Sequence, residues 1–228
     1  MSKKIQIDVV SDVVCPWCFV GKKHLEKAIA ALPEYDVEVR WHPFQLDPTV
    51  PENGVNKNEH YAKKFGSIER YEELSQRVVE AGERAGIKFN FKDIVNIPYT
   101  LSLHALIHEA DKLGRADELK ERFLKAFFEE ALDLTKKENI LKLTRDFGWD
   151  DAFVESVLEN KESAYWVTQE IRHYQNLGVT GVPFFIINNK YGLSGAQPPE
   201  VFIEALKEVG GPVETSEAEA CAIDDPNC

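Results

Sequence analysis

The feature that most constrains this chain is a pair of cysteines at the junction of a predicted strand and a predicted helix. Cys15 and Cys18 enclose a Pro-Trp dipeptide. A β-branched run at 5–10 precedes them, and apolar residues at helical spacing follow over 16–31. Pro16 suits a first helical turn because its missing N–H is not needed there. A thiol at that place faces unpaired N–H groups, which favour the reactive thiolate.

The cysteine pair has two chemical interpretations, a redox couple and half of a zinc site. Zinc needs four ligands, commonly from a second Cys-x-x-Cys or a nearby histidine pair. The other cysteines are Cys221 and Cys228, near the C-terminus and at the wrong spacing. We therefore predict a redox couple and no metal, with Cys15 as the nucleophile and Cys18 as the resolving thiol.

The order of the predicted elements indicates the fold class. Alternating residues at 37–41 predict a second strand, which completes a β-α-β unit. A buried strand at 182–187, an Asn-Asn turn and a short partner strand lead to a final helix that begins near Pro199. Together these outer parts resemble one thioredoxin fold, so we predict an α/β protein of the order β-α-β … β-β-α.

A block of about 125 residues separates the two halves, and its pattern is helical throughout. We predict a thioredoxin-fold domain at 1–50 and 178–211 and an all-helical insertion domain at 51–177. Within the insertion, apolar spacing predicts one long helix over 61–85. Residues 212–228 are acidic and poor in apolar side chains, which predicts a flexible tail.

Composition narrows the classes of partner. The chain has 228 residues and a net charge of −12, so nucleic acid and anionic membrane surfaces are not expected partners. No apolar run approaches the roughly 18 residues that indicate a membrane span. No signal peptide is evident, and in a cytoplasmic chain a Cys-x-x-Cys near a βαβ pattern is typical of a thioredoxin-like redox motif. We expect a cytoplasmic protein; nothing in the sequence indicates an oligomeric state.

Three segments carry a family resemblance: Cys-Pro-Trp-Cys-Phe-Val-Gly-Lys at 15–22, Gly-Val-Thr-Gly-Val-Pro-Phe-Phe at 178–185 and Ser-Gly-Ala-Gln-Pro at 194–198. With the helical insertion, they resemble the DsbA-like thioredoxin family. Within it they are similar to the FrnE-type cytoplasmic branch, close to 2-hydroxychromene-2-carboxylate isomerases and kappa-class glutathione transferases. The resemblance implies a thiol–disulfide oxidoreductase or disulfide isomerase without metal or nucleotide cofactor. It implies protein or small-molecule thiols and disulfides as partners, with glutathione as a candidate redox partner.

The alternative is a glutathione-dependent isomerase or kappa-type transferase. Those relatives carry a serine at the position of Cys15, so the thiol in this chain favours redox exchange. Some FrnE-type members have a second cysteine pair near the C-terminus. Cys221 and Cys228 enclose a turn signal and are therefore a candidate second redox pair; two free thiols on a mobile tail are the alternative.

The resemblance also implies the walls of the site. We expect a cis peptide at Val182–Pro183 facing the cysteines, with the Val182 backbone available to pair with an extended substrate. Trp17 is expected to expose an apolar face, and Pro16 to lie beside it. His104 lies in a segment that resembles a family motif and is a candidate site residue; a histidine on a helix flank is the alternative.

One departure from the thioredoxin pattern concerns the proton acceptor. Thioredoxin-like enzymes often bury an acid six residues before the nucleophile, and here that position is Val9. Asp12 is nearer to the pair and is a candidate proton acceptor near Cys18; a cap of the turn or a solvated carboxylate is the alternative. The sequence therefore leaves the acceptor unassigned.

Overall fold

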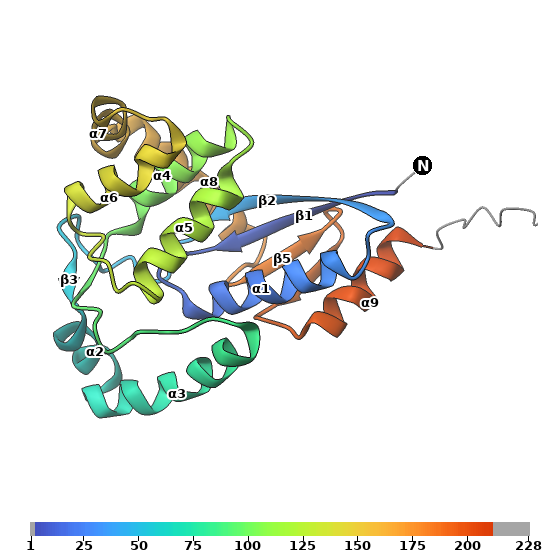
Figure 1. Cartoon of the computed structure of the whole chain (residues 1–228), viewed down its shortest axis with the longest axis horizontal. Helices are drawn as coiled ribbons and strands as arrows, with labels where there is room; N and C mark the ends of the chain where they lie inside the picture. Colours follow the sequence, from blue (N-terminus) through green and yellow to red (C-terminus); the bar gives the residue numbers. More distant parts are fainter. Residues whose placement is uncertain (1–2, 212–228) are drawn as a thin grey trace, which may run out of the picture.

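The computed structural model describes residues 3–211, which form a four-stranded sheet with a large helical insertion (Figure 1). The thioredoxin part contains β1 (Lys3–Ser11), α1 (Pro16–Ala30), β2 (Tyr35–Pro43), β5 (Phe184–Ile187), β6 (Tyr191–Ser194) and α9 (Pro199–Gly210). The insertion contains β3 (Val55–Asn56), α2 (Lys57–Phe65), α3 (Ile68–Ala85), β4 (Asn96–Ile97), α4 (Thr100–Asp111), α5 (Ala116–Phe128), α6 (Lys137–Thr144), a 3₁₀ turn (Arg145–Phe147), α7 (Asp151–Glu159) and α8 (Lys161–Asn176).

The sheet confirms the predicted topology. Its strand order is β2-β1-β5-β6, with β1 parallel to β2 and antiparallel to β5. Val9 pairs with Trp41 on one side and with Phe185 on the other. The β5–β6 turn is made by Asn188 and Asn189, both at positive φ (49° and 54°), as an Asn-Asn hairpin tip requires. The fold is therefore the predicted thioredoxin order.

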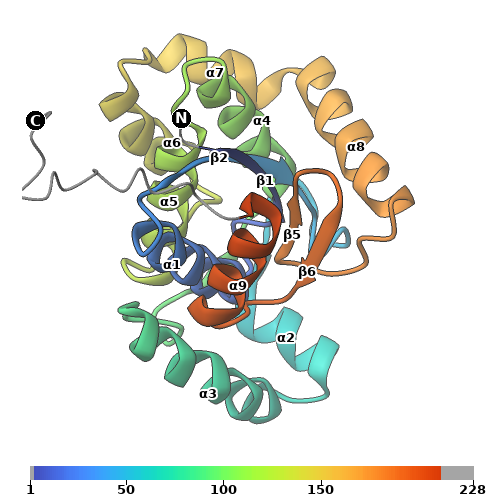
Figure 2. The same ribbon diagram turned by 90° about the vertical axis from the view of Figure 1, so that its right-hand side faces the viewer.

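Alternating side chains of β1 separate the two faces of the sheet. Ile5, Ile7 and Val9 are buried against α1 and α9, which lie side by side on one face (Figure 2). Val10 points to the other face, where it packs with Tyr174 of α8. Val9 is thus a core residue and supplies no proton acceptor.

The predicted helix over 61–85 is wrong, because two helices occupy this stretch. Gly66 has a φ of 93°, a left-handed conformation that ends α2. The side chain of Ser67 then caps α3 by accepting a hydrogen bond from the Arg70 N–H at 3.1 Å. The insertion also contains the short antiparallel pair β3–β4, which periodicity does not reveal in strands of two residues each.

The core of the insertion continues into the thioredoxin part. Phe19 of α1 is fully buried, and its ring stacks on Phe128 of α5 at a centroid distance of 6.5 Å. Val13, Val14 and Val20 belong to the same buried cluster. In Figure 1, α1 runs between α3 and α5. The N-terminal half of the cysteine-bearing helix therefore packs against the insertion. Across residues 3–211, no helix combines the length and apolarity of a membrane span.

His42 of β2 links the sheet to the insertion. Its Nε2 lies 2.8 Å from Oδ1 of Asp8, and its Nδ1 lies 2.7 Å from Oε1 of Glu170 on α8. Burial lowers the pKa of His42, but the two carboxylates outweigh burial and raise the pKa to about 9. The imidazolium is therefore charged at neutral pH and bridges two acids on separate elements.

We predict that His42→Gln removes a pH-dependent part of the stability. A histidine whose folded pKa is raised stabilises the fold fully below its unfolded pKa of roughly 6.5. That stabilisation is then lost as the pH rises through about 9. We expect a loss of roughly 2 kcal/mol at pH 6 and little loss near pH 10, a value discounted because Glu170 is partly exposed. Urea unfolding of the variant and the wild type at both pH values measures this loss of unfolding free energy.

His24→Gln is the matched control, because His24 faces the backbone carbonyl of Gln197 at 2.8 Å instead of two carboxylates. The variant removes a histidine without removing an ion bridge. An equal loss for His42→Gln at pH 6 and pH 10 would contradict the proposed ion bridge.

Candidate active site

The cysteine pair lies at the N-terminus of α1, as predicted. Cys15 is the N-cap residue in an extended conformation, and Pro16 is the first helical residue. The backbone N–H of Cys18 donates to the Cys15 carbonyl at 3.0 Å, which sets Cys18 one turn inward. Both side chains are buried, with 3% of Cys15 and 1% of Cys18 exposed. The pair is thus held at the positive end of a helix and largely shielded from water.

The Val182–Pro183 loop forms the opposite wall, and its peptide bond is cis as predicted. Sγ of Cys15 lies 3.6 Å from the Val182 carbonyl oxygen, within hydrogen-bond distance for sulfur. Gly21 allows this approach, because a Cβ there would lie 3.1 Å from both Pro183 and Phe185. Glycine one turn after Cys18 therefore brings the proline loop close to the helix.

Trp17 occupies the outer side of the pair. Its side chain is 40% exposed, whereas the neighbouring Cys15 and Cys18 are almost completely covered. This arrangement agrees with the expected exposed ring beside Cys15. An approaching substrate therefore meets the indole before it meets the thiols.

The two thiols ionise as a coupled pair. The hydrogen bond with Cys18 and then burial raise the pKa of the Cys15 thiol. Burial also raises the pKa of Cys18, but the hydrogen bond with Cys15 and the charge of Lys120 outweigh it and give a net lowering. The hydrogen bond between the two sulfurs therefore favours a singly ionised pair, in which one thiolate accepts the proton of the other thiol. Attack by Cys15 requires this shared proton to lie on Cys18.

Asp12 is buried, and its carboxylate binds three elements of the site. Oδ1 accepts from the Val13 N–H at 2.7 Å, and Oδ2 accepts from the Leu46 N–H at 2.8 Å. The Nε2 of His104 lies 3.2 Å from the same Oδ1. Asp12 is therefore not a solvated carboxylate; it caps the turn before Cys15, one of its expected roles, while α1 has no side-chain cap. It fixes the turn that leads into Cys15.

His104 is buried beside Asp12 and does not lie on a water-exposed helix flank. It is 4% exposed, and Nε2 also lies 3.0 Å from the Phe44 carbonyl. Burial lowers the pKa of His104, so the ring is neutral at pH 7. A neutral ring with Nε2 protonated donates to both oxygens. His104 thus positions Asp12 and does not face an incoming substrate.

Lys120 is the site residue that sequence reasoning missed. It belongs to α5 of the insertion, is 1% exposed, and its charge acts on Cys18, Asp12 and Cys15. Burial is the main reason that the pKa of Lys120 is lowered to about 8. The sequence did contain a signal for its burial: Lys120 lies three residues before Phe123 and therefore on the apolar face of this helix.

An apolar hollow of about 160 Å³ adjoins the pair on the side of α2 and α3. Val14 and Pro16, on either side of Cys15, belong to its lining. Aromatic side chains form much of the remaining wall: Tyr61, Phe65, Tyr71, Phe91, Phe127 and Phe128. The insertion therefore provides an apolar surface next to the dithiol.

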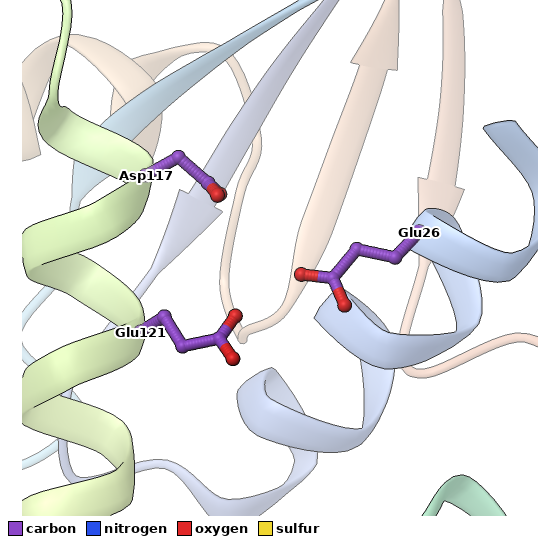
Figure 3. A group of neighbouring side chains, drawn as sticks. All are labelled: Glu26, Asp117 and Glu121. Carbon is purple, nitrogen blue, oxygen red and sulfur yellow. The ribbon is translucent and has the colours of Figure 1, made fainter. Parts of the chain in front are cut away.

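Three carboxylates between α1 and α5 have their oxygens within 4.8 Å of one another: Glu26, Asp117 and Glu121 (Figure 3). The ammonium of Lys22 lies among them, 3.0 Å from Asp117 and 2.7 Å from Glu121, and it also pairs with Glu26. A lysine thus supplies the positive charge that these acids need. We assign the cluster as an ion clamp between the two helices.

The predicted tail, 212–228, lies outside the described residues, and so do Cys221 and Cys228. Their assignment as a second redox pair stays a prediction.

Comparison with known proteins identifies the family. The model of the DSBA-like thioredoxin domain matches residues 6–207. The uncharacterised protein YwbO of Bacillus subtilis is 31% identical over 206 residues, which cover 90% of this chain and 96% of that protein. The solved structure of the probable DsbA oxidoreductase SCO1869 of Streptomyces coelicolor has a TM-score of 0.83 at 33% identity, covering 96% of this chain and 97% of that one.

A more distant structure shares the fold alone. The cytosolic disulfide reductase DsbM of Pseudomonas aeruginosa, solved with GSH, has a TM-score of 0.62 at 18% identity and covers 90% of this chain and 98% of its own. Together with the geometry of the dithiol, these findings confirm the predicted family, while the FrnE-type branch stays a prediction. The chain belongs to the DsbA-like thioredoxin family of thiol–disulfide oxidoreductases.

Proposed function

We propose that this protein exchanges disulfides with protein or small-molecule thiols through Cys15 and Cys18. The observation that carries the proposal is the position of the Cys15 thiol, at the start of α1 and 3.6 Å from the Val182 carbonyl. An extended substrate that pairs with the Val182 backbone would present its sulfur to this thiol. Cys18, one helical turn away, is then placed to resolve the mixed disulfide.

Each step of the exchange forms one sulfur–sulfur bond and breaks another. The Cys15 thiolate attacks one sulfur of a substrate disulfide, forms a mixed disulfide and releases a substrate thiolate. The Cys18 thiolate then attacks Sγ of Cys15, forms the internal disulfide and releases the second substrate thiolate. Running in reverse, the oxidised pair delivers a disulfide to a substrate dithiol. The reaction needs no metal or nucleotide, and the reduction potential sets its direction.

Glutathione is the proposed small-molecule redox partner, and the cytoplasm is the proposed location. Both proposals are supported by the fold shared with DsbM, which is described as a cytosolic disulfide reductase and was solved with GSH. The competing function is a glutathione-dependent isomerase or transferase. It differs in needing the glutathione thiol and one active-site side chain, whereas disulfide exchange needs both cysteines.

The proposed function is tested by redox equilibration of the intact chain in glutathione buffers of graded ratio. After acid quenching and alkylation, peptide mass mapping is expected to show a disulfide that joins Cys15 to Cys18. The reduced protein is expected to accelerate insulin reduction by dithiothreitol, and prior alkylation of the thiols is expected to abolish this acceleration. Failure to form the disulfide, or activity that survives alkylation, would overturn the proposal.

A further inference from the structure

The lining of the apolar hollow beside the dithiol includes a buried hydroxyl that has no hydrogen-bond partner. Thr100, the first residue of α4, belongs to this lining and is 3% exposed. Within residues 3–211, the hydroxyls of Thr100 and Ser11 are the buried side-chain polar atoms without a partner. A buried hydroxyl without a partner costs free energy and calls for an explanation. A polar group on a ligand in the hollow provides one.

The size and the walls of the hollow suit one aromatic ring. Its volume is about 160 Å³, and an apolar cavity of about 150 Å³ is large enough to bind benzene. Tyr61 and Tyr71 of the lining have ring centres 4.2 Å apart, and the Phe65 ring lies 5.7 Å from each of them. Such rings attract a further ring through edge and offset contacts in addition to its burial.

The charges around the hollow favour a neutral ligand. Two carboxylates and two ammonium groups belong to the lining: Asp12, Asp47, Lys57 and Lys64. Asp12 accepts from two backbone N–H groups, and Lys57 donates to the Phe91 carbonyl. Lys64 lies 2.6 Å from Asp47. An ionic ligand would therefore lose its water without gaining an unpaired counter-ion, whereas a neutral hydroxyl on the ring avoids this cost.

The hollow lies next to the dithiol and reaches the surface. Val14 and Pro16 line it and are the chain neighbours of Cys15, so their Cα atoms lie about 3.8 Å from that of Cys15. Leu46 and Phe65, also in the lining, are 39% and 37% exposed. In an extended substrate, a residue two positions from the cysteine lies up to roughly 7 Å from it. Its side chain is therefore close enough to enter the hollow while the substrate sulfur meets Cys15.

We propose that the hollow is a specificity subsite for a phenol ring and that Thr100 recognises the ring hydroxyl. The proposal rests on the proposed function and names its substrate class. The phenol is either a tyrosine side chain close to the substrate cysteine or part of a small phenolic thiol. The ring packs against Tyr61, Phe65 and Tyr71, and its hydroxyl pairs with the hydroxyl of Thr100. A phenylalanine side chain fills the same space but leaves the Thr100 hydroxyl buried and unpaired, so it binds less tightly.

Two probes of similar shape test the subsite without turnover. p-Cresol and toluene, which differ by one hydroxyl, are titrated into the reduced full-length protein, and backbone amide shifts are followed by NMR. Thr100→Val is expected to weaken p-cresol binding about tenfold and to leave toluene binding unchanged, because valine keeps the shape and removes one hydrogen bond. Thr168→Val is the matched control, since the Thr168 hydroxyl donates to the Ala164 carbonyl at 2.8 Å within α8. Phe65→Ala is expected to weaken the binding of both probes.

Peptide substrates distinguish the two sources of the phenol. Three peptides, each in mixed disulfide with glutathione, carry tyrosine, phenylalanine or leucine two residues from the cysteine. The tyrosine peptide is expected to have a kcat/KM about tenfold above that of the phenylalanine peptide, and Thr100→Val is expected to bring this ratio to about one. If p-cresol binding depends on Thr100 but the tyrosine and phenylalanine peptides react equally, the source is a small phenolic thiol.

The proposal would be overturned by equal p-cresol binding in the wild type and a folded Thr100→Val protein, by an equal loss in Thr168→Val, or by no binding of either probe to the wild type. Circular dichroism establishes folding, and Thr100→Ala takes the place of a valine variant that does not fold. The probe titration needs no turnover, so it tests the hollow even if insulin reduction fails. Loss of insulin reduction with intact p-cresol binding would count against the proposed function and not against the subsite.

Discussion

Replacing Cys15 with serine is expected to lower the rate of insulin reduction to the uncatalysed rate. Cys18→Ser, in contrast, is expected to stop the reaction at the mixed disulfide. A serine hydroxyl at position 15 cannot form the first sulfur–sulfur bond. With serine at position 18, Cys15 still attacks the substrate, but no second thiol resolves the product. The Cys18→Ser protein should therefore accumulate as a mixed disulfide, which intact-mass measurement detects as added substrate or glutathione.

The two variants distinguish the proposed function from its competitor. A glutathione-dependent isomerase or transferase needs no resolving thiol, so its turnover would survive Cys18→Ser. Full turnover of Cys18→Ser together with tight binding of glutathione would therefore contradict dithiol exchange. If Cys18→Ser turned over poorly and formed no adduct, while Cys15→Ser did form one, the roles of the two cysteines would be exchanged.

The catalytic half of the site could be predicted because its signals are local. Cys15, Pro16 and Cys18 are adjacent in sequence, and the strand before them and the helix after them fix their surroundings. The wall at Pro183 is distant in sequence, but it comes at the start of a recognisable strand and hairpin. Local patterns of this kind also predicted the β-α-β unit, because two strands joined by a helical crossover lie parallel in one sheet.

The groups behind the cysteines could not be predicted, because they depend on how the insertion packs. Lys120 is separated from Cys18 by about a hundred residues, and nothing near Lys120 in sequence points to a thiol. His104 was a candidate, but its partner Asp12 and its buried position follow from the packing of α4 against the turn before Cys15. The break of the helix at Gly66 is local, but glycine within a helical pattern is a weak signal.

The insertion is therefore a part of the active site as well as a cover for it. It supplies His104, which contacts Asp12, and Lys120, whose charge acts on Cys18, and it forms the aromatic wall of the hollow. A rearrangement of α5 against α1 would move Lys120 away from Cys18 without touching either cysteine. The contacts that hold these two helices together therefore matter for the chemistry as well as for stability.

Lys22→Met is expected to weaken that contact strongly. The ammonium of Lys22 is 1% exposed and pairs with Glu26 of its own helix and with Asp117 and Glu121 of α5. Three carboxylates within 4.8 Å would remain together without their central cation. Removing one partner of a buried ion pair typically costs 3–5 kcal/mol, and the partial exposure of Glu26 and Asp117 reduces this to about 2–4 kcal/mol. Urea unfolding at pH 7 measures the loss.

Lys23→Met is the matched control, because Lys23 is the neighbouring lysine, pairs with Glu26 and Glu121, and is 21% exposed. We expect it to cost about 1 kcal/mol or less, since an exposed pair is screened by water. Lowering the pH towards 4 should narrow the difference between Lys22→Met and wild type, because protonated acids no longer repel one another. If Lys22→Met and Lys23→Met were equally mild, α5 would be held to α1 by the Phe19–Phe128 contact, and the clamp would add little to the position of Lys120.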